Sequence, residues 1–417
     1  MISEPQVGLR RIAPTRLLAP VLAFLCGAVA APVAAGMPSL TPPELVQQSD
    51  VICIGTVLSV QKGARESYPT DVFLSGKPYM APAMKASAEL SVEEAIKGGP
   101  LPARISMDYL IDDQPARPGR PGTRWIGPIF AWIDHGERAL FFLKKGSDGG
   151  FHLFAPDNSP PTVWPATGAI PVATGPALTP IRQIMLFLAD EMTRGDSRRR
   201  LETLDRLQSC GDILQWKLNS ALNPLRAWAE TLRAQLDEPE AADLEGFVKQ
   251  RILPALAPLF NSEDPVVRGA ALAAAGALQD ASVIPQMVEA IHTLPRDRPG
   301  PSLESVLSQF RVKESFRLLV PLLKDFGAGV RDSVALALGH MNDRQALPFL
   351  IDNLDDTDND AWRSTATALA LITRQGPGGL PTVGVRERVD SFWRAWAVKH
   401  ADELRKLRAD FTAGGGP

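Results

Sequence analysis

Three aspartates at alternate positions, Asp356, Asp358 and Asp360, have the spacing with which a calcium-binding loop between two helices begins. Such a loop also needs a glycine at its sixth position, for the turn, and a bidentate glutamate at its twelfth. Here those positions hold Ala361 and Thr367. We therefore interpret the run as a solvated loop whose last Asp or Asn caps the following helix, and we predict no calcium site.

No other pattern of reactive residues points to catalysis or to a bound cofactor. The histidines are His135, His152, His292, His340 and His400. No two of them have metal-ligand spacing, and the chain contains no His-Glu-x-x-His, no Gly-x-Ser-x-Gly and no glycine-rich phosphate loop. We predict no catalytic residue, no cofactor site and no metal ligand; an active site assembled from distant residues is the alternative.

Three arginines, Arg268, Arg331 and Arg363, occupy one recurrent position of a repeated pattern. In a stack of repeats they would form a ladder. We expect them to bond acidic groups of the adjacent loop, as Asp264 could do for Arg268, and so to hold neighbouring units in register. An anion-binding stripe is the alternative.

One helical hairpin is repeated between Asp264 and Thr373, and it would position all of these residues. Val267, Arg268, Asp280, Ile284, Pro285, Met287, Val288 and Ile291 recur 63 positions later as Val330, Arg331, Asp343, Leu347, Pro348, Leu350, Ile351 and Leu354. Shifting Leu347, Leu350, Ile351 and Leu354 back by 31 gives Phe316, Leu319, Val320 and Leu323. A period of 31 to 32 residues predicts an α-solenoid.

Each unit carries its own helix-start signals. Asp264-Pro265 places a side-chain acceptor at the N-cap and a proline in the first turn, where its missing N–H costs nothing. Pro285 and Pro348 similarly open the second helix of their units. The first helices carry apolar stripes spaced four, three and four residues apart, which predicts that one face of each is buried. The stripes are Val267, Ala271, Ala274, Leu278; Val330, Val334, Ala337, Met341; and Trp362, Ala366, Leu369, Thr373.

These features resemble HEAT-like repeats, in the short form first associated with phycobilin lyases. The matching residues are the pairs Val267-Arg268, Val330-Arg331 and Trp362-Arg363, the alanine-rich first helices, and the Ile-Pro or Leu-Pro start of the second helix. The resemblance covers about residues 246–373. It implies a stack of helical hairpins that binds on its concave face, lined by the second helices. The same repeats serve lyases, scaffolds and structural proteins, so the resemblance names no ligand.

The part of the chain before the repeats predicts short β-strands. They are expected at 51–60, 87–96, 104–110, 138–144 and 151–154, with a long Pro- and Gly-rich excursion at 66–83. The first strand is dense in Val and Ile without a helical period, which predicts burial on both faces or a place in a small barrel. Short strands at this spacing favour a small β-barrel or sandwich.

The strand sequences themselves carry a second resemblance, over about residues 40–154. Ser49-Asp50-Val51-Ile52-Cys53-Ile54-Gly55-Thr56-Val57, Leu90-Ser91-Val92-Glu93-Glu94-Ala95-Ile96-Lys97-Gly98 and Glu137-Arg138-Ala139-Leu140-Phe141-Phe142-Leu143 resemble netrin-like modules, which have the fold of tissue metalloprotease inhibitors. Those inhibitors act through an N-terminal cysteine in a disulfide network. This module has one cysteine, Cys53, inside a strand, so the inhibitory function does not carry over.

The remaining segments are predicted from composition and periodicity. Residues 156–180 hold many prolines and are expected to be a linker, or a strap lying on a neighbour. A last helix is expected over 385–407 and a flexible tail over 411–417. Trp393 and Trp396 on this helix would cap the final apolar face or form an exposed binding anchor.

The N-terminus predicts export. Arg10, Arg11 and Arg16 precede an apolar run over 17–29 that ends in small residues, as in a cleaved signal peptide. An uncleaved membrane anchor is the alternative. After cleavage Cys53 and Cys210 would remain, either as one disulfide or as two buried thiols. The formal net charge of −3 leaves no basic footprint for nucleic acid.

Together these features predict an α+β multidomain protein. Its expected parts are a signal peptide at 1–35, a small OB- or netrin-like β-barrel at 40–155, a linker at 156–180, a HEAT-like α-solenoid at 181–410 and a tail at 411–417. We expect an exported, non-catalytic scaffold with a protein partner, no cofactor, no nucleic acid and no stable membrane span after cleavage. The alternatives are an enzyme, a lyase or hydrolase with a site at the domain junction, and a secreted peptidase inhibitor.

Overall fold

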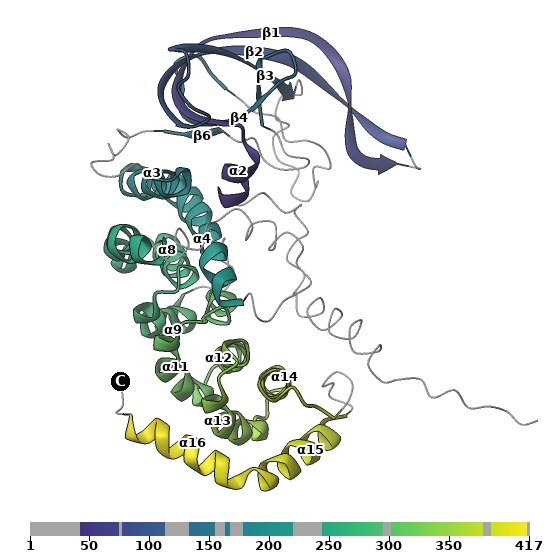
Figure 1. The fold of residues 1–417 in the computed structure, drawn as a ribbon, viewed down its shortest axis with the longest axis vertical. Coiled ribbons are helices and arrows are strands. Elements are labelled where there is room, and N and C mark those ends of the chain that lie inside the picture. The colour runs from purple at the N-terminus through teal and green to yellow at the C-terminus, as the bar shows by residue number, and fades with distance from the viewer. Residues whose placement is uncertain are drawn as a thin grey trace, which may run out of the picture.

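A computed structural model describes residues 42–74, 77–112, 133–154, 163–166, 178–219, 244–294, 302–377 and 385–414. The expected signal peptide at 1–35 lies outside the described residues. A small β-barrel and the short helix α2 (Pro42–Gln48) stand at one end of a curved stack of helices, and the chain ends at the other (Figure 1). This arrangement confirms the predicted fold class.

The barrel is built from strands β1 to β5. The strands are β1 (Val51–Leu74), β2 (Lys77–Lys97), β3 (Arg104–Asp112), β4 (Arg138–Lys145) and β5 (Phe151–Leu153), followed by β6 (Val163–Pro165). The order is β1-β2-β3-β5-β4, and β4 pairs back with β1 to close the sheet. The pairing of β3 with β5 is parallel and the other pairings are antiparallel. This is an OB-like barrel.

The prediction of a loop-like excursion at 66–83 is wrong, because these residues continue two paired strands. Strands β1 and β2 continue past the barrel as an antiparallel ribbon, with Tyr68 opposite Ala81 and Leu74 opposite Lys77. Figure 1 shows this ribbon projecting from the barrel. Each strand satisfies the other's backbone groups, and register shifts after Lys62 and Pro69 absorb the residues that do not fit a regular ladder.

The linker expected at 156–180 contains a strand. β6 pairs antiparallel with β4, so that Trp164 lies opposite Leu140. The buried Trp164 ring meets Phe142 edge to face, with 4.8 Å between the ring centroids, and Arg206 stacks over it at 4.9 Å. The burial of one large aromatic side chain therefore holds β6 against the barrel.

The helical part is a stack of two layers. The first helices are α4 (Ser197–Asn219), α8 (Pro265–Ala277), α10 (Leu303–Leu307), α12 (Ala328–Met341) and α14 (Asn359–Thr373), and each packs against the next. The second-helix layer consists of α9 (Ile284–Thr293), α11 (Lys313–Leu319) with the short helix η5 (Val320–Lys324), α13 (Leu347–Asp352) and α15 (Arg386–Lys399). Helices α3 (Pro180–Arg194) and α7 (Leu253–Leu256), with η2 (Val248–Ile252) and η3 (Ala257–Asn261), begin the stack.

The chain end differs from the prediction of one helix over 385–407 and a flexible tail from 411. Helix α15 ends at Lys399, and α16 (Ala401–Ala413) starts after His400, whose φ of −109° and ψ of 20° are not helical. Residues 411–413 are helical because Phe411 packs on Phe316 and Phe349 of the repeats. The turn at His400 is what brings Phe411 to that surface.

The first part of β1, residues 51–57, and strand β4 are buried on both faces, as predicted for the first of them. Their inward side chains form the barrel interior: Val51, Cys53, Val57, Ala139, Phe141 and Leu143. Their outward side chains, Ile52, Ile54, Leu140 and Phe142, belong to the same apolar cluster as Ile184 and Leu188 of α3 and the cores of the repeats. The outer face of this barrel wall and the solenoid therefore share one continuous core, and the barrel interior forms a separate cluster.

Cys53 and Cys210 are both buried and both free thiols. Cys53 lies in the barrel interior and Cys210 in the helical core, so they belong to different clusters. Among the residues described, no helix is long and apolar enough to cross a membrane.

Replacing Phe142 by alanine tests the shared core. The side chain is fully buried at the junction, so we expect a loss of about 3–5 kcal/mol of unfolding free energy. Far-UV circular dichroism, which follows the helices, and hydrogen exchange of barrel amides should report one common unfolding midpoint. Phe326→Ala, at a ring that is 81% exposed, is the control and should cost less than about 1 kcal/mol. Separate midpoints would contradict a shared core.

Thiol titration tests the cysteines. Burial raises the pKa of the Cys53 thiol to about 12, so hardly any thiolate exists at neutral pH. In the full chain with Cys26→Ser, an aromatic disulfide reagent should label neither remaining cysteine in the native state and both in denaturant. A native signal, or a denatured chain without free thiols, would contradict the structure.

Candidate interaction surface

Side-chain caps set the start of α8, α10 and α14, whereas α12 begins at Gly327 without one. The Asp264 carboxylate accepts hydrogen bonds from the N–H groups of Val266 (2.9 Å) and Val267 (3.3 Å), and Pro265 occupies the first turn of α8. Asp280 and Asp343 cap the short turns before the second helices, which Pro285 and Pro348 open. These local bonds explain why the hairpin repeats in the sequence.

Helices α8, α12 and α14 are each followed by a left-handed residue that sequence reasoning missed. Gln279, Asn342 and Arg374 have φ values of 65°, 54° and 58°. None is a glycine, so each position carries backbone strain. The Gln279 side chain offsets it by bonding the next unit: its Oε1 accepts from Arg311 N–H at 2.7 Å, and its Nε2 donates to the Gln309 carbonyl at 3.2 Å.

Arg311 passes this connection on to the following unit. Its guanidinium donates to the carbonyls of Ser308 and Phe310, and it lies 2.7 Å from Nδ1 of His340. Burial, together with the neighbouring guanidinium, lowers the pKa of His340 to about 4. His340 is therefore neutral at neutral pH, and its Nδ1 can accept the bond from Arg311.

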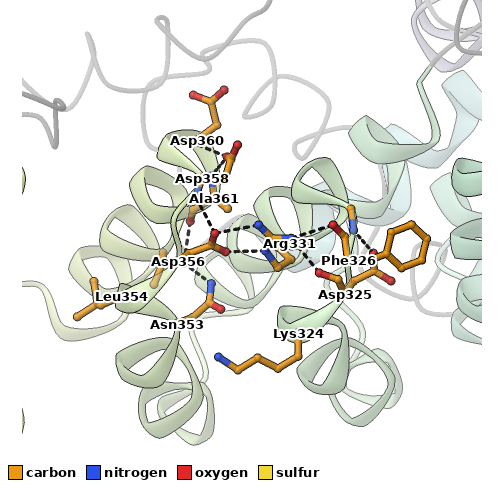
Figure 2. A network of polar contacts seen from close by, with 12 residues as sticks. Lys324, Asp325, Phe326, Arg331, Asn353, Leu354, Asp356, Asp358, Asp360 and Ala361 are labelled. Atoms are coloured by element: carbon orange, nitrogen blue, oxygen red, sulfur yellow. Dashed lines mark hydrogen bonds and ion pairs between the residues drawn. The ribbon is translucent and has the colours of Figure 1, made fainter.

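Arg331 makes a two-pronged polar contact between units (Figure 2). Its Nε and Nη2 donate to the two carboxylate oxygens of Asp356 at 2.6 and 2.9 Å, and its Nη1 donates to the carbonyls of Asp325 and Phe326. The side chains of Arg331 and Asp356 are only 16% and 4% exposed. Burial would raise the pKa of Asp356, but the bonds from Arg331 and from the Asp358 N–H outweigh it and hold that pKa below 3.8.

The other two arginines do not repeat this geometry. Arg268 has no ion-pair partner among the described residues, although Asp264 lies in the same turn. Arg363 meets Asp360 at 3.1 Å in an exposed pair within its own helix. Backbone bonds to the cap residue show that Arg268 and Arg331 correspond to Trp362, not to Arg363. The unit whose first helix is α14 thus begins one residue earlier than the sequence comparison suggests.

At the Trp362 position another arginine supplies the charge. Trp362 is fully buried and its indole N–H donates to Asp390 at 2.8 Å. Arg386 stacks over the indole at 5.0 Å and donates to the Asp356 carbonyl at 2.5 Å. The inter-unit link is therefore kept while the residue that provides it changes.

The acidic run serves these contacts. Asp356 binds Arg331, and Asp358 caps α14 by accepting from the N–H groups of Asp360 and Ala361. Within the described part of the chain, no group of three or more His, Cys, Asp or Glu side chains could hold a metal ion.

Trp393 and Trp396 lie inside the end of the stack. Trp393 is fully buried and Trp396 is 6% exposed, with His400 stacked on Trp396 at 4.1 Å. Their burial fits the cap interpretation and leaves no surface for an exposed anchor.

Helix α16 lies across the second-helix layer, beyond α13 in Figure 1. The ring of Phe411 meets Phe349 of α13 at 4.8 Å and Phe316 of α11 at 5.9 Å, edge to face in both cases. Leu404 and Leu407 are half-buried on the same side. This layer, expected from the sequence to bind partners, thus carries an apolar surface that already holds a helix.

The barrel offers a second and shallower feature. Strands β1, β2 and β3 surround an open depression of about 280 Å³. It is lined by Ser59, Gln61, Ser87, Ala88, Glu89, Arg104, Ile105 and Ser106. Its two charged residues, Glu89 and Arg104, face solvent and pair with each other at 3.6 Å. No buried charge here would select a small ligand.

Replacing Arg331 by glutamine leaves the Asp356 carboxylate buried and unpaired, so we expect a loss of about 2–4 kcal/mol near neutral pH. Because the pKa of Asp356 is depressed in the folded state, its contribution is complete above the unfolded pKa and is lost as pH falls through the folded one. The difference between the two proteins should therefore shrink below about pH 4. Denaturant titration at several pH values measures it.

Arg363→Gln is the matched control for that measurement. Its ion pair with Asp360 is exposed at both ends, so stability should change by no more than about 0.5 kcal/mol at any pH. Equal losses in the two variants would contradict the assignment of Arg331 as the link between units.

Comparison with known proteins supports the repeat. The sequence profile of the family of HEAT repeats matches residues 305–371, which run from α10 to α14. No curated protein gives a significant match to the chain.

One similar solved structure is the crystal structure of an engineered protein from the Northeast Structural Genomics Consortium. It aligns with 56% of this chain and 98% of its own, at 17% sequence identity and a TM-score of 0.28. A TM-score this low supports no statement about fold or function. The comparisons therefore show a likeness to HEAT repeats over residues 305–371.

Proposed function

We propose that this protein is an exported, non-catalytic scaffold that binds a protein partner through the second-helix layer of its HEAT-like array. One observation carries the proposal: the layer presents aromatic rings from neighbouring units, Phe316 and Phe349, to which a helix docks without burying any of its own residues. Stacked helical repeats characteristically bind proteins on such extended surfaces.

The barrel takes part in this proposal as a fixed neighbour of the array. Because Ile52, Ile54 and Phe142 lie in the helical core, the barrel keeps a defined position relative to the repeats. A partner can therefore contact both parts at once. The netrin-like resemblance of the barrel and the lyase-type resemblance of the repeats enter the proposal as likenesses of architecture, and neither assigns a reaction.

Export rests on residues 1–35 and is tested by mass spectrometry of the chain recovered from its producing cells. We expect an envelope or extracellular protein whose N-terminus begins close after Ala30 or Ala35, the two sites that follow small residues. A full-length chain starting at Met1 in the cytoplasm would contradict export. A full-length chain in the membrane fraction would indicate the uncleaved anchor.

Affinity capture tests the scaffold. The full chain, incubated with an envelope extract, should recover a specific protein. Phe349→Asp should reduce recovery at least about ten-fold, because it places a charge in the apolar contact. Gln61→Ala, at the depression on the barrel, is the control and should leave recovery unchanged. The scaffold proposal is wrong if no partner is recovered while the purified chain turns over a substrate.

A further inference from the structure

The last two helices are held to the molecule very differently. Helix α15 buries Val389, Trp393 and Trp396, whereas α16 buries none of its residues. The non-helical residue His400 separates them. Rotation at His400 can therefore release α16 from the surface while α15 stays packed.

The apolar contact of α16 is a single stripe. Leu404, Leu407 and Phe411 follow helical spacing, and all three are half-buried against the core. Phe411 lies between Phe316 of one unit and Phe349 of the next, so the docking surface is formed by two repeats together. Arg317 and Arg408 stack on Phe411 and Phe349 respectively.

Two ion pairs of opposite sense lie along this stripe. Near the start of α16, Glu403 accepts from Arg344 Nε (2.9 Å) and Nη2 (2.5 Å). Towards its end, Arg408 donates to Asp352 (2.7 Å) and to the Pro348 carbonyl (3.1 Å). The surface thus offers a cation where the docked helix brings an acid, and an anion where it brings a base. All four charged side chains are at least 34% exposed, so solvent screens both pairs.

We propose that α16 is a releasable occupant of a helix-docking surface, and that this surface binds an amphipathic partner helix carrying the same pattern. The pattern is an acidic residue, Leu-x-x-Leu, a basic residue and then an aromatic residue, as in Glu403, Leu404, Leu407, Arg408 and Phe411. The inference rests on the proposed function, and it names the chemistry of the partner and the element that competes with it.

The charges define both the class of partner and its direction. Arg344 meets an acid before the apolar stripe and Asp352 meets a base within it, so the two charges favour one direction of a bound helix. A membrane or a polyanion has charge of one sign and would satisfy Arg344 while being repelled by Asp352. The stripe also needs two helical turns, which an extended strand cannot supply.

The probe is a labelled, acetylated peptide of residues 401–414, and the receptor is the full chain. In the receptor Leu407→Asp/Phe411→Ala, α16 no longer docks and its surface is open. We expect this variant to bind the peptide about ten-fold more tightly than the wild-type chain, in which α16 occupies the surface most of the time. Near-UV circular dichroism of Trp362, Trp393 and Trp396 checks that the fold is kept.

A charge exchange gives a readout that a structural role alone would not produce. In the open receptor, Arg344→Glu should weaken the peptide about ten-fold, and a peptide with Glu403→Arg should regain the loss. Phe349→Ala should weaken both peptides. A peptide carrying Leu407→Asp should bind neither receptor.

Hydrogen exchange of the wild-type chain tests release without any peptide. Amides of α16 should exchange about 100-fold faster than those of α15. Equal protection of the two helices would overturn release, and no peptide binding by the open receptor would overturn the docking surface. A wild-type dimer that dissociates on Phe411→Ala would also overturn the proposal, because α16 would then be exchanged between two copies. In each case partner capture by the full chain still tests the proposed function separately.

Discussion

The burial of one barrel wall on both of its faces is the constraint on which the rest of the molecule depends. Ile52, Ile54, Leu140 and Phe142 project from β1 and β4 into the helical core, while their sequence neighbours fill the barrel. A solenoid normally ends in a polar cap, since a terminal repeat has no neighbour to cover its apolar face. Here the barrel is that cover, and β6 extends it through Trp164.

Along the array, polar bonds between units help to fix the register of one unit against the next. The second helices are short and several end as tight turns, so the apolar packing between units comes mainly from the first helices. Arg331 with Asp356, and Gln279 with Arg311, supply oriented bonds across those junctions. Charge-assisted, partly buried bonds of this kind set register more strictly than apolar packing does.

At the far end, the stack is closed from within by Trp393 and Trp396 and covered from outside by α16. The two tryptophans are buried, whereas α16 buries none of its residues. The tryptophans therefore stabilise this end of the stack, and α16 determines whether its outer surface is accessible. Removing α16 exposes half-buried aromatic rings but leaves the tryptophan cap in place. The same end of the molecule can therefore be both a stable terminus and a surface open to exchange.

The sequence by itself determined the repeats, their caps and the barrel strands, because hydrophobic period, Asp-Pro starts and β-branched runs are local signals. It did not place Arg363 correctly, because the unit of α14 begins one residue earlier than the sequence comparison suggests. Only the backbone bonds to the cap residue define where each unit begins. Only the tertiary structure decided that β6 joins the barrel and that α16 docks on the repeats. Trp164 packs on Phe142, and Glu403 pairs with Arg344, which lies 59 residues away in the sequence. Contacts between residues so far apart depend on tertiary burial and charge, which no local sequence pattern contains.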